Sequence, residues 1–205
     1  VSGLDSLVGI CLITIIAQTF WFFGLHGASI TQPIRLPFMQ MYLITNIAAY
    51  SAGKPLVHFF TQPFWSYIIA LGGGGATLGL CILLVRSKSV ELRTLGKLSI
   101  GPAFFNINEP IIFGTPIVLN IYLLVPFVLV PLIIGISSYL LMYFGILPLF
   151  SGVMVPWTTP PIISGFLIGG WKVALWQLVM IIISFVVYFP FIKKIDTLSS
   201  KNENK

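Results

Sequence analysis

Four apolar stretches dominate the sequence, and each is close to the length that crosses the hydrocarbon core of a membrane. They are Leu4–Phe23, Pro63–Val85, Ile121–Phe144 and Trp171–Ile192. A helix of about 20 residues crosses a core that is roughly 30 Å thick. Only 8% of the residues are charged, against about 25% in soluble domains. The sequence therefore predicts an all-α integral membrane protein with several transmembrane helices.

Positive charges are concentrated at two places beside these apolar stretches. The net charge is +6, and most of the lysine and arginine residues lie in Arg86–Lys97 and Lys193–Lys205. Short segments rich in these residues mark the cytoplasmic side of a membrane protein, so the charge does not indicate binding to nucleic acid. We expect Arg86–Lys97 to be a cytoplasmic loop. Residues 193–205 are predicted to form a polar cytoplasmic tail that is disordered from Ser199 onward.

Proline and glycine interrupt the apolar stretches. Leu98–Asn120 contains three prolines, which cannot continue a regular helix, and it is predicted to form a re-entrant hairpin. Ala28–Phe38 is predicted to be irregular or re-entrant, and Met39–Ser51 to be a short or amphipathic helix. Val155–Gly165 also holds three prolines and is predicted to be non-helical. The run Gly72–Gly75 indicates close helix packing or a hinge, and it lacks the residues of a phosphate-binding loop.

Glu109 is the only acidic residue between Glu91 and Asp196, and apolar and aromatic residues surround it. An ionised carboxylate in hydrocarbon costs several kcal/mol unless it is paired, hydrated or neutralised. Pro110 follows it directly, so the backbone is predicted to be broken here. Broken backbone at membrane depth is tolerated only inside protein or along a wet cavity. Glu109 is therefore predicted to be a functional carboxylate that faces a polar cavity.

Other polar and aromatic side chains share these predicted breaks. The candidate binding residues are Trp21, His26, Asn106, Asn108, Glu109, Trp157 and Thr158. Carboxylates and amides bond to sugar hydroxyls, and aromatic rings stack on the apolar face of a sugar. A structural histidine at a helix end is the simpler interpretation of His26, and a tryptophan at the membrane interface is that of Trp157. Taken together, the set predicts a binding site for a polar solute such as a sugar.

The remaining polar and aromatic residues of interest are interpreted as structural. His58 has no polar neighbour in the sequence, and Trp65 is expected to anchor the chain at the membrane interface or to pack inside it. Cys11 and Cys81 lie within apolar runs, which gives no support for a disulfide or a metal site. No cofactor is expected.

The residues alone point to two functional classes, catalysis and transport. His26 and Glu109 have the chemistry of a general acid–base pair, but no activated nucleophile or phosphate-binding motif accompanies them. Binding and passage of a polar solute is favoured over bond chemistry. The alternative is an ion- or proton-coupled secondary transporter in which Glu109 and His26 form a titrating pair.

Three motifs bear a resemblance to a known family. They are Trp-Phe-Phe-Gly-Leu-His-Gly at 21–27, Phe-Asn-Ile-Asn-Glu-Pro-Ile-Ile-Phe-Gly at 105–114 and Pro-Trp-Thr-Thr-Pro-Pro at 156–161. In their order and spacing they resemble the membrane component IIC of the bacterial phosphoenolpyruvate-dependent sugar phosphotransferase system. The lactose/cellobiose/diacetylchitobiose branch is the nearest, and the run Asn-Glu-Pro-Ile-Ile-Phe-Gly is highly specific for it.

The resemblance also implies how the chain is organised. It covers nearly the whole chain, which corresponds to the C-terminal, substrate-binding half of proteins about twice as long. Residues 1–192 are accordingly expected to be the membrane-embedded sugar-binding half of a multi-pass protein of the bacterial plasma membrane. Because the chain begins with Val1, we expect it to be a piece of a longer protein. In the family the absent N-terminal spans form most of a homodimer contact.

The resemblance further implies a mechanism. Such a permease carries a β-linked disaccharide across the bilayer for phosphorylation by a cytosolic IIB partner, so no phosphorylated or catalytic residue is expected on this chain. Glu109 matches the glutamate that bonds the hydroxyl receiving the phosphate, and His26 matches a histidine near the same end of the sugar. Trp21 and Trp157 match tryptophans that stack on the sugar. Asn106 and Asn108 are weaker correspondences.

Overall fold

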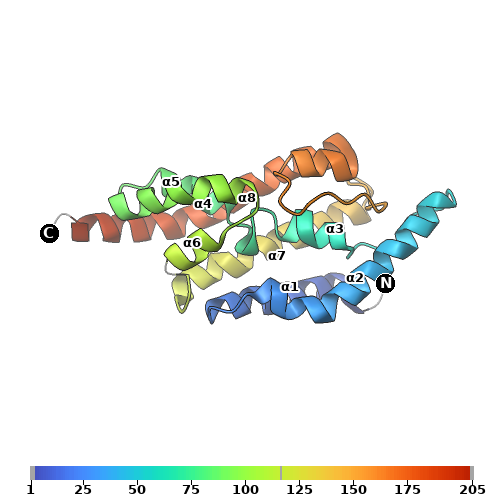
Figure 1. Ribbon diagram of the computed structural model, residues 1–205, viewed down its shortest axis with the longest axis horizontal. Coiled ribbons are helices and arrows are strands. Elements are labelled where there is room, and N and C mark those ends of the chain that lie inside the picture. The colour runs from blue at the N-terminus through green and yellow to red at the C-terminus, as the bar shows by residue number, and fades with distance from the viewer. Residues whose placement is uncertain (1–2, 116, 204–205) are drawn as a thin grey trace.

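The computed structural model describes residues 3–115 and 117–203 of the chain, which are folded into an elongated bundle of helices (Figure 1). No β-strand occurs in these ranges. The elements in chain order are η1 (Gly3–Asp5), α1 (Leu7–Phe22), α2 (Gly27–Ser51), α3 (Gln62–Phe64), η2 (Trp65–Ile69), η3 (Gly74–Ala76), α4 (Leu78–Val85), α5 (Val90–Phe104), α6 (Glu109–Gly114), α7 (Ile121–Tyr143) and α8 (Ile163–Glu203). The predicted all-α class is confirmed.

Within the described ranges, two helices are long and apolar enough to cross a membrane, namely Ile121–Tyr143 and the part Ile163–Lys201 of α8. A third span is possible if the bent pair Gln62–Ala76 and Leu78–Val85, which meet at 41°, is counted as one. The helix predicted over Leu4–Phe23 is present, but its 16 residues reach only about 24 Å at 1.5 Å per residue. It is therefore shorter than the predicted full span.

Helix α2 corrects the prediction that Ala28–Phe38 is irregular. It runs without interruption over Gly27–Ser51 and includes Pro33 and Pro37. Both prolines are exposed and lie one turn apart, so their rings share the outward face of the helix. The inward face remains regular and packs against the rest of the bundle.

The basic segment predicted as a loop, Arg86–Lys97, is mostly helical, because α5 begins at Val90. Ser89 caps this helix by accepting a hydrogen bond from the backbone N–H of Leu92. A serine directly before a run with helical periodicity commonly marks the start of a helix. The prediction gave more weight to the basic residues and so missed this cap. Residues 90–97 therefore belong to the helix that leads to the predicted hairpin.

The C-terminal tail also differs from the prediction, because α8 continues as a helix to Glu203. Residues 204 and 205 lie outside the described part of the chain. Asp196 accepts hydrogen bonds from the backbone N–H groups of Lys88 and Ser89 and from the Ser87 hydroxyl. These bonds hold the tail beside the segment that precedes α5, so the two basic segments lie side by side (Figure 1).

The glycine run forms neither a straight helix nor an open hinge. Gly72, Gly73 and Gly75 have positive φ values of 73°, 89° and 74°, so the chain turns sharply between η2 and α4. A Cβ atom on Gly75 would lie 2.3 Å from a ring carbon of Phe127 in α7. The glycines are required by this backbone shape and by the close approach of other elements. Close helix packing does occur at Gly79, whose face meets Ser184 and Phe185 of α8.

Asp5 and His58 form a pair that the sequence did not predict. His58 Nδ1 lies 2.7 Å from Asp5 Oδ2, and the other carboxylate oxygen accepts hydrogen bonds from the backbone N–H groups of Phe59 and Phe60. Asp5 is buried. His58 is structural, as predicted, but the view that it has no polar neighbour was wrong.

Candidate functional site

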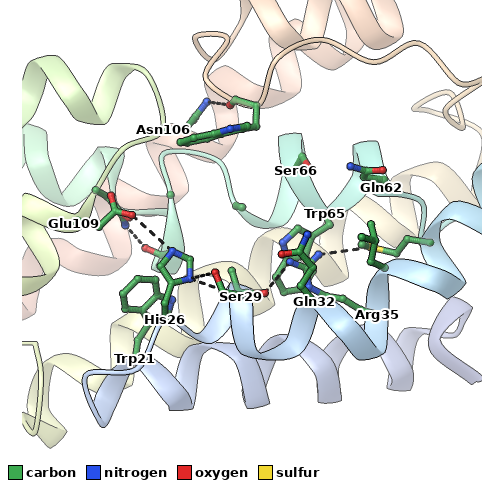
Figure 2. A pocket seen from close by; sticks show the side chains of 18 residues that line it. Trp21, His26, Ser29, Gln32, Arg35, Gln62, Trp65, Ser66, Asn106 and Glu109 are labelled. Carbon is green, nitrogen blue, oxygen red and sulfur yellow. Dashed lines mark hydrogen bonds and ion pairs between the residues drawn. The ribbon is translucent and has the colours of Figure 1, made fainter.

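A half-open cavity of about 400 Å³ lies where several breaks in the helices meet (Figure 2). Its wall is built from the end of α1, the start of α2, the segment α3–η2, the glycine run, the turn between α5 and α6, and the loop before α8. The lining residues are Trp21, His26, Ala28, Ser29, Gln32, Arg35, Leu36, Met39, Gln62, Trp65, Ser66, Ala70, Gly73, Gly74, Asn106, Asn108, Glu109 and Trp157. The three predicted breaks therefore converge on one cavity.

Glu109 is the first residue of the short helix α6, directly after the turn that ends α5. Pro110 occupies the first turn of α6, where a missing backbone N–H removes no helical hydrogen bond. The Glu109 side chain is 45% exposed and lines the cavity. This position agrees with the prediction of an acid on broken backbone facing a polar cavity.

His26 caps helix α2 and faces Glu109. Its Nδ1 accepts a hydrogen bond from the backbone N–H of Ser29 at 3.1 Å. In the neutral ring the proton therefore lies on Nε2, which is 3.7 Å from Glu109 Oε1. This separation exceeds an ordinary hydrogen bond, and both side chains are nearly half exposed. His26 combines the structural role considered from the sequence with a position at the cavity.

The turn before α2 is held against α1 by a glycine. A Cβ atom on Gly27 would lie 1.7 Å from the carbonyl oxygen of Ala17, so only glycine allows this approach. Trp21, in the last turn of α1, lies under the imidazole of His26 with 4.4 Å between the ring centroids. Trp21 is almost fully buried, so it offers the cavity only an edge.

Trp157 lies in the proline-rich loop before α8 and is 58% exposed, so much of its ring is open to a ligand. Its carbonyl oxygen accepts a hydrogen bond from the Asn106 amide at 2.8 Å. Thr158 is next to it in the chain but does not line the cavity. The non-helical backbone predicted for this segment is present up to Ile162, and α8 begins at Ile163.

The two asparagines before Glu109 line the cavity and also hold its wall together. The Asn106 amide donates to the carbonyls of Trp157 and Thr159 and accepts from the backbone N–H of Gly72. The Asn108 amide donates to the carbonyl of Gly74 and to Thr77 Oγ1. Both asparagines thus donate two hydrogen bonds within the protein. The Asn106 oxygen also accepts one from Gly72, whereas no hydrogen bond from the described residues reaches the Asn108 oxygen.

Sequence reasoning missed the polar side chains at the other end of the cavity. Gln32 and Arg35 come from α2, Gln62 begins α3, and Ser66 lies in η2. Trp65, interpreted as an anchor or packing residue, is buried and lines the cavity. Gln32 and Arg35 lie one turn apart on α2, and that spacing would have been a signal if the segment had been recognised as a helix.

The geometry of the described residues gives no support for a metal site. The described residues contain no group of three or more histidine, cysteine, aspartate or glutamate side chains that could hold a metal ion. Cys81 is buried, and Cys11 is partly buried. The polar groups of the cavity are suited to hydrogen bonding with a neutral polar ligand.

The long apolar helices and the polar cavity between them are those of a helical membrane protein. Comparison with known sequences shows to which family of membrane proteins the chain belongs. The sequence profile of the family described as phosphotransferase system, EIIC matches residues 1–131. The chain belongs to this EIIC family, whose members are membrane transport proteins.

Individual relatives match almost the whole chain. A lichenan permease IIC component of Bacillus subtilis (strain 168) is 43% identical over 202 residues, which are 97% of this chain and 45% of that protein. A cellobiose-specific EIIC component of Geobacillus stearothermophilus is 39% identical over 203 residues, with coverage of 97% and 45%. The chain therefore spans about half the length of the relatives it matches.

A solved structure has the same fold. The crystal structure of the transporter ChbC, the IIC component from the N,N'-diacetylchitobiose-specific phosphotransferase system, superposes with a TM-score of 0.94 and 38% sequence identity. The match covers 98% of this chain and 47% of that one. The helix breaks that build the cavity therefore belong to a fold already seen in a sugar transporter.

Proposed function

We propose that this chain is the substrate-binding half of a IIC sugar permease that binds and translocates a β-linked disaccharide for phosphorylation. In this proposal residues 1–192 are embedded in the bacterial plasma membrane and cross it several times. Residues 193–205 lie on the cytoplasmic side. Support comes from the relatives, which are named for lichenan, cellobiose, lactose and N,N'-diacetylchitobiose.

The observation that carries the proposal is the meeting of Glu109, His26 and Trp157 at one cavity. Its volume of about 400 Å³ lies within the range of roughly 300–1,000 Å³ that is typical of small-molecule sites. Among the residues that the structure describes, Glu109 has no partner closer than His26 at 3.7 Å, so its oxygens can accept hydrogen bonds from hydroxyl groups. An unsatisfied carboxylate in such a cavity favours a ligand that is rich in hydroxyls.

Each candidate residue is given a role that fits its position. Glu109 accepts a hydrogen bond from the sugar hydroxyl that later receives the phosphate, and His26 Nε2 donates to an oxygen of the same ring. The exposed ring of Trp157 stacks on the apolar face of the sugar, and the edge of Trp21 closes the floor. Asn108 contributes its free side-chain oxygen.

Asn106 and Thr158 are placed differently. Asn106 uses its side-chain oxygen as well as its amide hydrogens within the protein, so we propose that it acts mainly by holding the loop that carries Trp157. Thr158 does not line the cavity, so we leave it out of the proposed contacts.

The phosphoryl donor lies outside this chain in the proposal. A cytosolic IIB component supplies the phosphate, and this chain supplies no phosphorylated residue. Relatives named as lactose-specific EIICB components support the pairing of the two functions. We further propose that the full-length protein is a homodimer.

Binding of β-linked disaccharides tests this proposal. Cellobiose, diacetylchitobiose and lactose are titrated into the detergent-purified full-length permease that contains this chain, as wild type and as Glu109→Gln. We expect one of the sugars to bind, and its affinity to fall at least tenfold in the variant, which is about 1.4 kcal/mol. The amide keeps the shape of the side chain but loses the charge that strengthens its bond to a hydroxyl.

The matched control is Glu91→Gln, which neutralises an exposed acid on α5 that does not line the cavity. Its affinity for the sugar should equal that of the wild type. A wild-type protein that binds none of the sugars, or a Glu109→Gln variant with full affinity, would overturn the assignment of the site.

A further inference from the structure

The loop that carries Trp157 has no helical backbone of its own to hold it in place. Residues 144–162 connect α7 to α8 without forming a helix. More than half of Trp157 is exposed, so packing of its ring within the protein constrains the ring little. The position of the ring at the cavity therefore depends on the groups that hold the backbone of the loop.

Tyr67 of η2 holds the loop shortly before Trp157. Its hydroxyl donates a hydrogen bond to the carbonyl oxygen of Val155 and accepts one from the backbone N–H of the same residue at 3.0 Å. The Tyr67 side chain is buried and does not line the cavity, whereas its neighbours Trp65 and Ser66 do. Tyr67 therefore joins the loop to a wall of the cavity from a position behind that wall.

Gln177 of α8 holds the other end of the loop. Its side-chain oxygen accepts hydrogen bonds from the backbone N–H groups of Ile162 at 2.6 Å and Gly165 at 2.9 Å. Its side-chain nitrogen donates to the carbonyl oxygen of Tyr67 at 3.0 Å and to Ser164 Oγ at 3.1 Å. Gln177 is buried and does not line the cavity. One side chain thus binds both the end of the loop and the residue that holds its start.

The backbone at Ile162 shows why this end of the loop needs an attachment. Its φ is +72°, a left-handed conformation that β-branched residues rarely adopt. Such a conformation persists only where the surrounding structure holds it. The hydrogen bond from the Ile162 N–H to Gln177 is a contact of this kind.

We propose that Tyr67 and Gln177 are positioning residues that fix Trp157 at the cavity. The inference rests on the proposed function, in which Trp157 stacks on the sugar, and it deepens that function by naming what keeps the ring in place. Asn106 holds the middle of the loop at the carbonyl oxygens of Trp157 and Thr159 (Figure 2). Tyr67 and Gln177 hold its two ends. Because the loop is ordered before the ligand arrives, binding does not lose free energy in ordering it.

A double-mutant cycle tests whether Tyr67 acts through Trp157. Cellobiose is titrated into the detergent-purified full-length permease that contains this chain, as wild type, Tyr67→Phe, Trp157→Ala and the double variant. Tyr67→Phe keeps the ring of the tyrosine and removes only its hydroxyl. We expect it to lower the affinity about fivefold when Trp157 is present and less than about twofold beside Trp157→Ala, where the loop has no ring to place. Gln177→Met should follow the same pattern.

Two controls separate positioning from a general loss of stability. Tyr50→Phe makes the same change at an exposed residue of α2 that does not line the cavity, and it should leave the affinity unchanged. Tyr188→Phe also removes a buried hydroxyl, which donates to the carbonyl oxygen of Gly75 and not to the loop. Any loss of affinity that it causes should be the same with and without Trp157. Thermal unfolding verifies that every variant is folded.

Hydrogen exchange without sugar tests the same attachments independently of binding. The Thr159 N–H donates to the carbonyl oxygen of Pro156 within the loop. Its exchange should be at least about fivefold faster in Tyr67→Phe and in Gln177→Met than in the wild type, because a loop held at fewer points opens more often.

Unchanged affinity in both variants, equal losses with and without Trp157, or unchanged exchange at Thr159 would each overturn the positioning role. A wild-type protein that binds no sugar would instead overturn the proposed function. The exchange at Thr159 would then decide by itself whether Tyr67 and Gln177 hold the loop.

Discussion

At the scale of single residues, two acidic side chains in apolar surroundings differ in how far their oxygens are hydrogen-bonded within the protein. Asp5 accepts hydrogen bonds from the backbone N–H groups of Phe59 and Phe60 and lies 2.7 Å from His58 Nδ1. Glu109 has His26 at 3.7 Å as its one polar partner in the described part of the chain, and its side chain remains 45% exposed. A carboxylate with every oxygen engaged stabilises the fold, whereas one with free oxygens is available to a ligand. We therefore assign structure to Asp5 and binding to Glu109.

The structural role of Asp5 predicts that Asp5→Asn destabilises the protein. Asparagine has one oxygen acceptor in place of two and carries no charge, so the hydrogen bonds from Phe59 and Phe60 become weaker and the ionic contact with His58 is lost. Hydrogen bonds to a charged group are worth about 1.5–3 kcal/mol, so the free energy of unfolding should fall by about that amount. Denaturant unfolding in detergent measures it. Glu91→Gln, at an exposed acid, should stay within about 0.5 kcal/mol of the wild type, and equal stability of both variants would contradict the role of Asp5.

Local signals in the sequence were sufficient for part of the site. A lone acid in an apolar run, a histidine between glycines and a tryptophan among prolines are each visible without the fold, and the structure places Glu109, His26 and Trp157 at one cavity. Gln62 and Arg35 were missed because a polar residue carries no signal of its own until tertiary packing shows which cavity it lines. Gln62 and Arg35 line the cavity only because α2 and α3 come together in the folded chain.

At the scale of elements, the apolar runs predicted the long helices well. The expected span Ile121–Phe144 is α7, Ile121–Tyr143, and the expected span from Trp171 begins directly after the kink at Gly170 in α8. The errors came from prolines and charges. Exposed prolines did not break α2, and the predicted disordered tail is helical to Glu203, because carboxylates at the end of α8 bond to the start of α5. Such contacts between distant segments are invisible to local propensity.

The glycine run predicts a specific mutational result. Gly75→Ala should lower the free energy of unfolding by about 1–2 kcal/mol, because alanine disfavours the left-handed backbone at this position. The loss should be larger still, because the new methyl group would lie 2.3 Å from a ring carbon of Phe127. Gly145→Ala is the matched control, since its φ is +71° and nothing lies within 4 Å of the added atom. Denaturant midpoints should therefore fall further for Gly75→Ala. Equal losses would show that the chain around Gly75 relaxes freely.

The contact between α8 and α5 should depend on pH. Glu203 accepts hydrogen bonds from Ser89 Oγ, from the backbone N–H of Val90 and from that of Glu91, and these bonds lower its pKa below the ordinary value of 4.5. A lowered pKa means that the stabilisation is present above pH 4.5 and is lost as the pH falls through the folded-state value. Acid should therefore release the tail from the start of α5.

Hydrogen exchange at the amides of Val90 and Glu91, corrected for the intrinsic rate, measures this release. Protection should decrease below pH 4.5 in the wild type. In Glu203→Gln it should already be low at neutral pH and should change little in acid. The same pH profile in both proteins would contradict a cap made by Glu203.

At the scale of the whole molecule, the cavity exists because several interrupted helices meet near the glycine run. Asn108 reaches the run from the α5–α6 turn, Gln18 reaches it from α1, and Tyr188 from α8. The backbone groups freed by these breaks are bonded by side chains from neighbouring elements. Irregular backbone inside a membrane protein requires this compensation, and it leaves a polar cavity within an apolar bundle. The fold thus offers the proposed sugar a polar cavity between apolar helices.

The central claim is that this cavity holds a sugar for phosphorylation, and accumulation of phosphorylated cellobiose tests it most directly. The assay uses vesicles with the full-length permease, its IIB partner and phosphoenolpyruvate-driven phosphoryl donors, with and without an uncoupler. We predict phosphorylated cellobiose inside the vesicles, insensitive to the uncoupler, retained in Glu91→Gln and lost in Glu109→Gln. Unmodified sugar whose uptake collapses with the ion gradient would contradict the account and favour an ion-coupled transporter.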